Sequence, residues 1–211
     1  MSSPPTHHRR GRPAPKTLSI ADDLQICIRP ITPEDRERVL EGLQSITVET
    51  SYRRFFTPSF YPSDDELRYL TDVDYDRHVA LGVVDCTQAG HPGVGAARYV
   101  RLADEPTIAE AAVLVIDAYQ HRGIGSLLLA ALSQHAAQNG VARFRGFVLQ
   151  DNDAFLSFLR ALGAVDETTR EGVVQIDLPV YPDPDPVPKT PLTERAHWAW
   201  EKLQTADERV C

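Results

Sequence analysis

The sequence predicts a mixed α/β fold whose sheet contains at least one parallel crossover, and two features support this prediction. Three extended apolar segments follow one another between residues 78 and 117, as is typical of neighbouring strands. Between residues 108 and 178 the pattern alternates as strand, helix, strand, helix, strand, which favours a parallel connection. With 42% hydrophobic and 25% charged residues among 211, the chain can bury the core of one domain.

The first half of the chain shows one strand and two helices. Residues 24–29 alternate between apolar and polar side chains, which is the two-residue period of a half-buried strand. Thr32 can cap a helix, and Pro33 suits its first position because proline has no backbone N–H to satisfy. Ser63 can cap a second helix, although the signal between residues 52 and 70 is mixed. The expected elements are a strand over 24–29, a helix from 33 to about 44 and a helix over 64–71.

The second half of the chain carries stronger patterns. Apolar residues recur at helical spacing from residue 124 to 135, and Asn139-Gly140 is a good left-handed stop for this helix. Residues 151–153 can cap the next helix, whose buried face should hold Phe155, Phe158, Leu159 and Leu162. The expected elements are strands over 78–85, 93–102 and 108–117, a helix over 124–138, a strand over 144–149, a helix ending at Gly163 and a strand over 173–178.

Composition divides the chain into a body and two tails. Residues 1–16 hold four prolines and four cationic side chains, so we expect a disordered arm there. The body extends over 17–180, and the prolines of 181–191 favour a semi-rigid connector. Residues 192–211 should form a C-terminal helix capped by Thr193, which either docks on its own domain or binds a partner. Because the connector separates this helix from the body, we expect it to be dispensable for chemistry, so that truncation after about Val180 leaves a folded enzyme.

Charge and residue spacing argue against several classes of protein. The net charge of −8, from 22 Lys and Arg against 30 Asp and Glu, argues against binding to nucleic acid or to an anionic membrane. The longest apolar run, over residues 111–116, is far shorter than the roughly 20 residues of a transmembrane helix. Cys27, Cys86 and Cys211 lack a Cys-x-x-Cys pair, so neither a metal site nor a disulfide framework is supported. We expect a soluble cytoplasmic protein with reduced thiols.

The segment Gln120-His121-Arg122-Gly123-Ile124-Gly125 has the composition of an anion-binding loop. Its two glycines allow a tight turn, and the helix that follows adds unpaired N–H groups and the positive end of its dipole. A phosphate group is the most plausible ligand, although a plain strand-to-helix turn would look the same locally. A dinucleotide fingerprint needs a small residue where Leu128 stands, and a P-loop needs a Gly-Lys-Ser/Thr sequence that is missing.

Residues 110–163 resemble the core of the GNAT superfamily of acyl-CoA N-acyltransferases. The shared pattern is a strand, a pyrophosphate loop of the form Gln/Arg-x-x-Gly-x-Gly, a helix, a strand and an asparagine that opens the next helix. Gln120 replaces the commoner arginine of this loop. Further segments resemble the bacterial protein lysine acetyltransferases of the Pat type, so that the resemblance covers about 24–178: Ile28-Arg29-Pro30, Ser51 to Phe56, Tyr75 to Ala80 and Ala97-Arg98-Tyr99.

This resemblance implies a mostly antiparallel sheet with a central splayed parallel strand pair, flanked by helices, and a site for acetyl-CoA without a metal. The backbone of Leu114 and Val115 would pair with the pantetheine arm as if it were another strand. Asn152 would contact the same arm. The implied pyrophosphate site consists of Gln120, His121, Arg122, Gly123, Ile124, Gly125 and Ser126.

Glu110 is the candidate general base. A lysine-like amine with a pKa near 10.4 is almost fully protonated at pH 7, so its acetylation requires removal of a proton. In the Pat-type subgroup a glutamate in this strand position serves as the base, and residues 109–113 match its surroundings. Since Glu110 shares a strand face with Ala112, Leu114 and Ile116, we expect partly apolar surroundings, whereas the alternative is an exposed glutamate at the start of a strand.

The resemblance leaves three functions open. The first is acetylation of a primary amine, with a protein lysine as the favoured acceptor, and the second is acetylation of a small amine. The third is a catalytically weak CoA-binding sensor, which is suggested by one departure from the family. Many relatives use a tyrosine as the acid toward the leaving thiolate, and Leu159 stands at that position here. The thiolate would then take its proton from solvent or from another group.

Overall fold

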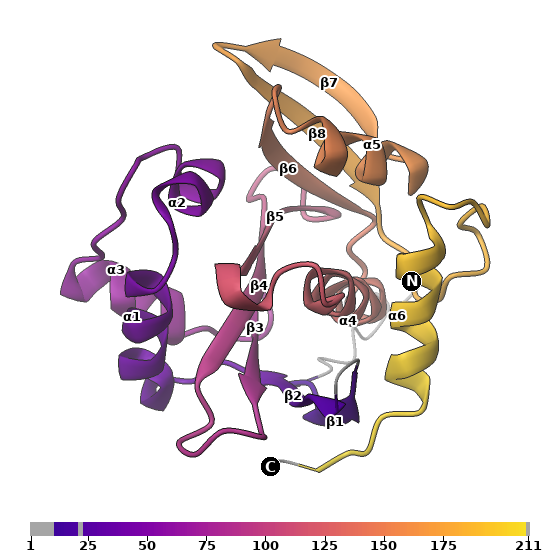
Figure 1. Ribbon diagram of the computed structural model, residues 1–211. Coiled ribbons are helices and arrows are strands. Elements are labelled where there is room, and N and C mark those ends of the chain that lie inside the picture. Colours follow the sequence, from indigo (N-terminus) through magenta and orange to yellow (C-terminus); the bar gives the residue numbers. More distant parts are fainter. Residues whose placement is uncertain (1–10, 21–22, 210–211) are drawn as a thin grey trace, which may run out of the picture.

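The computed structural model describes residues 11–20 and 23–209 and shows one eight-stranded sheet with helices on both faces (Figure 1). The strand order is β1-β2-β3-β4-β5-β6-β8-β7, and every neighbouring pair is antiparallel except β5 and β6. The predicted mixed α/β fold with one parallel crossover is therefore confirmed. Most of the predicted disordered arm, residues 1–10, lies outside the described residues.

The strands predicted from the apolar segments are confirmed, and the sheet contains two further strands, β1 and β7, that the sequence did not indicate. β1 is only four residues long, and β7 is a polar edge strand joined to β8 by a turn in which Glu171 and Gly172 both have positive φ. Neither shows apolar alternation. The strands are β1 (Lys16–Ser19), β2 (Gln25–Pro30), β3 (His78–Asp85), β4 (Gly93–Arg101), β5 (Ile108–Val115), β6 (Arg143–Leu149), β7 (Val165–Arg170) and β8 (Val173–Pro179).

The predicted helices are confirmed, and the structure contains one further helix, α2, which overlaps the start of the region in which the sequence pattern is mixed. Ser63 and Glu66 cap each other's backbone at the start of α3, as the sequence indicates. Helix α4 ends before Gly140, whose φ is +79°. The helices are α1 (Arg36–Gln44), α2 (Val48–Phe55), α3 (Asp64–Thr71), α4 (Ile124–Gln138), α5 (Asp153–Ala161) and α6 (Glu194–Gln204), with short 3-10 turns at Pro33–Asp35 and Asp117–Tyr119.

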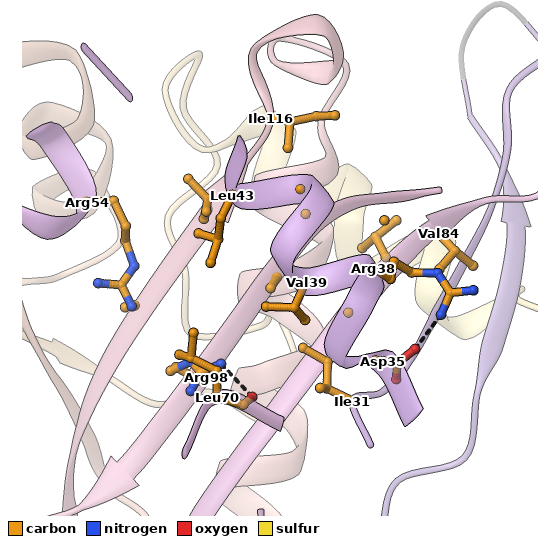
Figure 2. Close-up of a pocket in the computed structure, with 18 of the residues that line it drawn as sticks. Ile31, Asp35, Arg38, Val39, Leu43, Arg54, Leu70, Val84, Arg98 and Ile116 are labelled. Atoms are coloured by element: carbon orange, nitrogen blue, oxygen red, sulfur yellow. Dashed lines mark hydrogen bonds and ion pairs between the residues drawn. The ribbon is translucent and has the colours of Figure 1, made fainter. Parts of the chain in front are cut away.

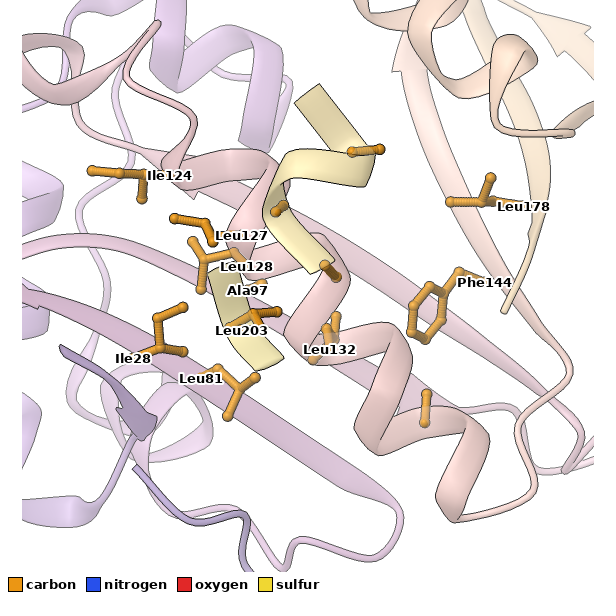
Figure 3. Packing of buried hydrophobic residues seen from close by; sticks show 14 of the residues in the cluster. Ile28, Leu81, Ala97, Ile124, Leu127, Leu128, Leu132, Phe144, Leu178 and Leu203 are labelled. Carbon is orange, nitrogen blue, oxygen red and sulfur yellow. The ribbon is translucent and has the colours of Figure 1, made fainter. Parts of the chain in front are cut away.

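The core lies between the sheet and α4, whose Ile124, Leu128 and Leu132 are almost fully buried (Figure 3). Helices α1 to α3 cover the opposite face of the sheet (Figure 1). Helix α5 contributes Leu156, Leu159 and Leu162 to the core. The expectation that Phe155 and Phe158 share this buried face is wrong: both are only half-buried, because the leucines turn toward the sheet and leave the aromatic rings at its border.

Helix α6 docks on its own chain and completes the core. Its Ala196, Ala199, Trp200 and Leu203 are buried in the same cluster as α4. Beyond the helix, Asp207 exchanges two backbone hydrogen bonds with Thr17 of β1. The expectation that the body closes without this helix is therefore wrong. Thr193 occupies the predicted N-cap position, but its hydroxyl accepts a hydrogen bond from Thr190 N–H at 2.9 Å and makes no cap hydrogen bond to α6.

The described residues include no helix that is long and apolar enough to span a membrane. In the same part of the chain, no group of three His, Cys, Asp or Glu side chains is placed to hold a metal ion. Cys27 is a buried free thiol, as expected, whereas Cys86 is disulfide-bonded, so the expectation of reduced cysteines is wrong for Cys86.

Replacing Leu203 by alanine should destabilise the protein, because this α6 side chain is only 1% exposed against α4. We expect the free energy of unfolding, measured by urea denaturation, to fall by about 2–5 kcal/mol. Leu192→Ala is the matched control, because Leu192 is 54% exposed. Unfolding curves for Leu203→Ala and Leu192→Ala that both overlay the wild-type curve would contradict a structural role for α6.

Candidate active site

The site begins where β5 and β6 separate. The two strands pair only at Ile108 with Arg143, Ala109 with Phe144 and Glu110 with Arg145. Beyond these pairs, β5 stays on β4 as far as Val115, and β6 stays on β8 as far as Leu149. The splayed parallel pair expected from the resemblance is thus present, and the edge of β5 that faces β6 is open from residue 111 onward.

The glycine loop lies at the end of this open strand. His121 and Gly123 have φ values of +62° and +89°, and α4 begins directly afterwards at Ile124. Such left-handed positions turn successive N–H groups toward one side, where the dipole of α4 adds positive potential. Gly125 lies against β5, since a Cβ there would be 3.8 Å from Cγ2 of Val115. The loop and the strand edge therefore form one continuous surface for an elongated anionic ligand.

The side chain of Gln120 links this loop to β5 and to α2. Its side-chain amide donates hydrogen bonds to the Val115 carbonyl at 3.1 Å and to the Thr50 hydroxyl at 3.2 Å. The amide of Gln120 is therefore engaged by the protein itself, and one lone pair of the Val115 carbonyl is already used. The groups of the loop that stay available for an anion are its backbone N–H groups and the side chains of His121, Arg122 and Ser126.

Helix α6 covers the other side of the loop, a contact that the sequence did not reveal. A Cβ at position 123 would lie 2.6 Å from Cζ3 of Trp198 and 3.3 Å from Cδ of Arg195. The Arg195 guanidinium carbon lies 5.2 Å from the centroid of the Trp198 ring. Two independent reasons favour glycine at position 123: its φ is positive, and Trp198 leaves no room for a side chain.

Glu110 occupies the last of the parallel pairs, at the point where the sheet opens. Across the β4–β5 ladder it faces Val100, while Ala112 faces Arg98, so Glu110 and Arg98 project from the same face of the sheet. The side chain of Glu110 is exposed. The expectation of partly apolar surroundings is therefore wrong, and the alternative of an exposed glutamate near the start of its strand holds.

A pocket adjoins Glu110 on this face, between helices α1 to α3 and strands β3 to β5 (Figure 2). Its walls are largely apolar and include Ile31, Val39, Leu43, Leu70, Leu114 and Ile116. Arg54 enters the pocket from α2 and Arg98 from β4 (Figure 2). Neither arginine has a sequence signal for function beyond its position in a segment that resembles Pat-type enzymes.

Asn152 and Leu159, which the sequence analysis singles out, belong to α5 and its N-cap, whereas Tyr119 follows β5. Asn152 is at the start of α5 and accepts the Leu156 N–H with its backbone carbonyl at 3.0 Å. Leu159, at the position of the family's tyrosine, is buried in the core and supplies no acid. Tyr119 donates its hydroxyl to Asp85 at 2.7 Å, and burial together with this carboxylate raises the pKa of Tyr119 to about 12.

Comparison with known proteins agrees with this arrangement. Residues 25–165 match the family model of the acetyltransferase (GNAT) domain. Acetyltransferase Pat of Mycolicibacterium smegmatis is 41% identical over 164 residues, which make up 78% of this chain and 48% of that protein. The chain thus spans about half the length of this relative.

Two solved structures share the fold and detectable sequence identity. The GNAT domain of S. lividans PAT has a TM-score of 0.70 and 27% identity, covering 84% of this chain and 99% of that one. The cAMP-binding acyltransferase from Mycobacterium smegmatis has a TM-score of 0.55 and 35% identity, covering 90% of this chain and 54% of that one. The chain belongs to the GNAT acetyltransferase family.

Proposed function

We propose that this chain transfers the acetyl group of acetyl-CoA to a primary amine, and that the acceptor is a protein lysine. The observation that carries the proposal is the open edge of β5 ending at a glycine loop and a helix N-terminus. A strand edge suits the amides of a pantetheine arm, and the loop suits a pyrophosphate. The name of the relative, acetyltransferase Pat, supports acetyl transfer as the activity. The resemblance of this chain to Pat-type protein lysine acetyltransferases supports a lysine as the acceptor.

In this proposal the cofactor lies along β5. The backbone of Leu114 and Val115 binds the pantetheine arm, and Asn152 contacts it from α5. The loop residues hold the pyrophosphate, with Gln120 acting as the anchor that keeps the loop on β5 through the Val115 carbonyl. The binding residues are Leu114, Val115, Gln120, His121, Arg122, Gly123, Ile124, Gly125, Ser126 and Asn152. Acetyl-CoA supplies the activated thioester.

Glu110 acts as the general base in the proposed reaction. The exposed carboxylate takes a proton from the acceptor ammonium, directly or through water, and the neutral nitrogen attacks the thioester carbonyl. A C–N bond forms, the C–S bond breaks and the CoA thiolate leaves, while the new amide nitrogen releases its second proton to water. Because Leu159 offers no proton, solvent at the open edge protonates the thiolate. The position of Glu110 at the mouth of the splay supports this role.

The acceptor class can be tested with labelled acetyl-CoA. The purified protein is incubated with a cell lysate, and mass spectrometry locates the label. Label on protein lysines would support the proposal. Label confined to small amines would favour the alternative acetyltransferase, whereas an absence of label would favour a CoA-binding sensor.

Gly125→Val should weaken the binding of acetyl-CoA. A Cβ at this position is accommodated beside Val115, so the fold should persist, but the larger side chain occupies the surface between loop and strand. We expect a loss of more than about tenfold in affinity by calorimetry, or roughly 1.4 kcal/mol. Gly123 is a poorer choice, because any side chain there also displaces Trp198. Unchanged affinity with an unchanged unfolding midpoint would refute the cofactor site.

Glu110→Gln should slow turnover without affecting the cofactor. The amide keeps the shape of the side chain and removes its basicity, so we expect kcat to fall by about 10²- to 10⁴-fold. Acetyl-CoA affinity should stay within about threefold, because Glu110 lies outside the pyrophosphate loop. Glu105→Gln is the matched control, since this nearby carboxylate is exposed and 3.6 Å from Arg145. A near-normal kcat for Glu110→Gln with saturating amine would exclude Glu110 as the base.

A further inference from the structure

The pocket beside Glu110 contains four arginines, and they differ in how their charges are balanced. Arg29 and Arg38 both form ion pairs with Asp35, which is almost fully buried. The Arg29 guanidinium also donates to the second Asp35 oxygen at 2.8 Å. In this network at one end of the pocket, both guanidinium groups share the carboxylate of Asp35, and Figure 2 shows Arg38 beside Asp35.

Arg54 and Arg98 lack such a partner at the other end. Arg98 donates to the Leu70 carbonyl at 3.0 Å and lies 3.3 Å from Nε2 of His78, and both partners are uncharged groups. The Arg54 guanidinium carbon lies 4.7 Å from the centroid of the Phe55 ring. Among the residues that the structure describes, no carboxylate is within ion-pair distance of either arginine. Glu110 acts on Arg54 only at longer range.

The two unpaired cations raise the positive potential of the pocket. Burial lowers the pKa of Arg54, and burial together with the neighbouring Arg54 lowers the pKa of Arg98 to about 10. Two positive charges thus face one carboxylate, Glu110, in a chain whose net charge is −8. A desolvated charge without a partner is costly, and an anion bound between the two guanidinium groups would offset this cost.

This excess of positive charge matters for the acceptor, because a lysine arrives as a cation. A lone ammonium group would approach Glu110 against the repulsion of Arg54 and Arg98. An acceptor that brings its own carboxylate would instead neutralise the arginines, whose planar donor arrays suit the two oxygens of a carboxylate.

Helices α2 and α3, which contribute to the lining of the pocket, also present a surface that suits a polypeptide. Exposed aromatic side chains gather on α2, α3 and the segment between them, with Tyr52 47%, Phe56 42%, Tyr61 80% and Tyr69 54% exposed. Aromatic residues are enriched where proteins bind proteins, since they offer large contact areas at a low cost in side-chain entropy. Arg54 lies on the same short helix as Tyr52.

We infer that the acceptor is an acidic polypeptide segment, in which the target lysine has an Asp or Glu close by whose carboxylate binds Arg54 and Arg98. This inference rests on the proposed lysine acetylation. It adds a determinant of acceptor choice that is separate from the base and from the cofactor loop.

The test uses the full chain, labelled acetyl-CoA and two synthetic peptides that differ only in whether Asp or Ala flanks the lysine. Wild-type protein should have a KM for the Asp peptide at least about tenfold below that for the Ala peptide. Arg54→Gln should remove this preference by raising the KM of the Asp peptide alone, and Arg54→Lys should retain part of it. Arg53→Gln is the matched control, because Arg53 is exposed on the same helix and paired with Glu49.

Modified lysines in a lysate provide an independent measurement. Lysines labelled by the wild-type protein should be enriched in neighbouring Asp and Glu, and this enrichment should disappear with Arg54→Gln. Equal KM values for the two peptides, or an Arg54→Gln variant that affects both equally, would overturn the inference while leaving lysine acetylation intact. Label on metabolites alone, or on nothing, would instead overturn the proposed function, and the inference with it.

Discussion

The separation of β5 from β6 after three residue pairs is the constraint on which the rest of the site depends. Each strand keeps a longer ladder on its other side, with β4 and with β8. Arg145 of β6 stabilises the pairing of β6 with β8, because its guanidinium donates two hydrogen bonds of 2.9 Å to the buried Asp177 of β8. Because both outer ladders continue while the inner one ends, the sheet opens in its middle and leaves Glu110, the edge of β5 and the glycine loop around one opening.

Asp117 connects the end of β5 to the start of α2. It follows β5 directly, and its carboxylate accepts hydrogen bonds from Thr47 N–H at 2.9 Å and from the Thr47 and Thr50 hydroxyls, each at 2.8 Å. Burial raises the pKa of Asp117, but these hydrogen bonds outweigh it, so the pKa lies below its usual value. Since Gln120 also contacts Thr50, the start of α2 is tied to the glycine loop. The position of Arg54 on α2 thus follows from contacts made at the end of β5.

Local signals were sufficient for much of the fold and for part of the site. The capping box of α3, the glycine after α4 and the apolar strands are visible in the sequence because they depend on residues within one turn or one strand of each other. The glycine loop belongs to the same class, since its conformation follows from its own residues. Glu110 was also identified from the sequence as a candidate, although only its family resemblance singled it out from other carboxylates.

The sequence by itself determined the order of most elements, the alternation of the main strands, and the glycine loop. Tertiary structure decided what surrounds them. It stabilised the polar helix α2 through Asp117, left Glu110 exposed at the last residue pair of β5 and β6, and placed Trp198 against Gly123. It also made α6 part of the core. These outcomes depend on side chains that are tens of residues apart in the chain, whereas periodicity and caps depend only on residues close in sequence. Packing and charge balance are defined only when distant segments come together.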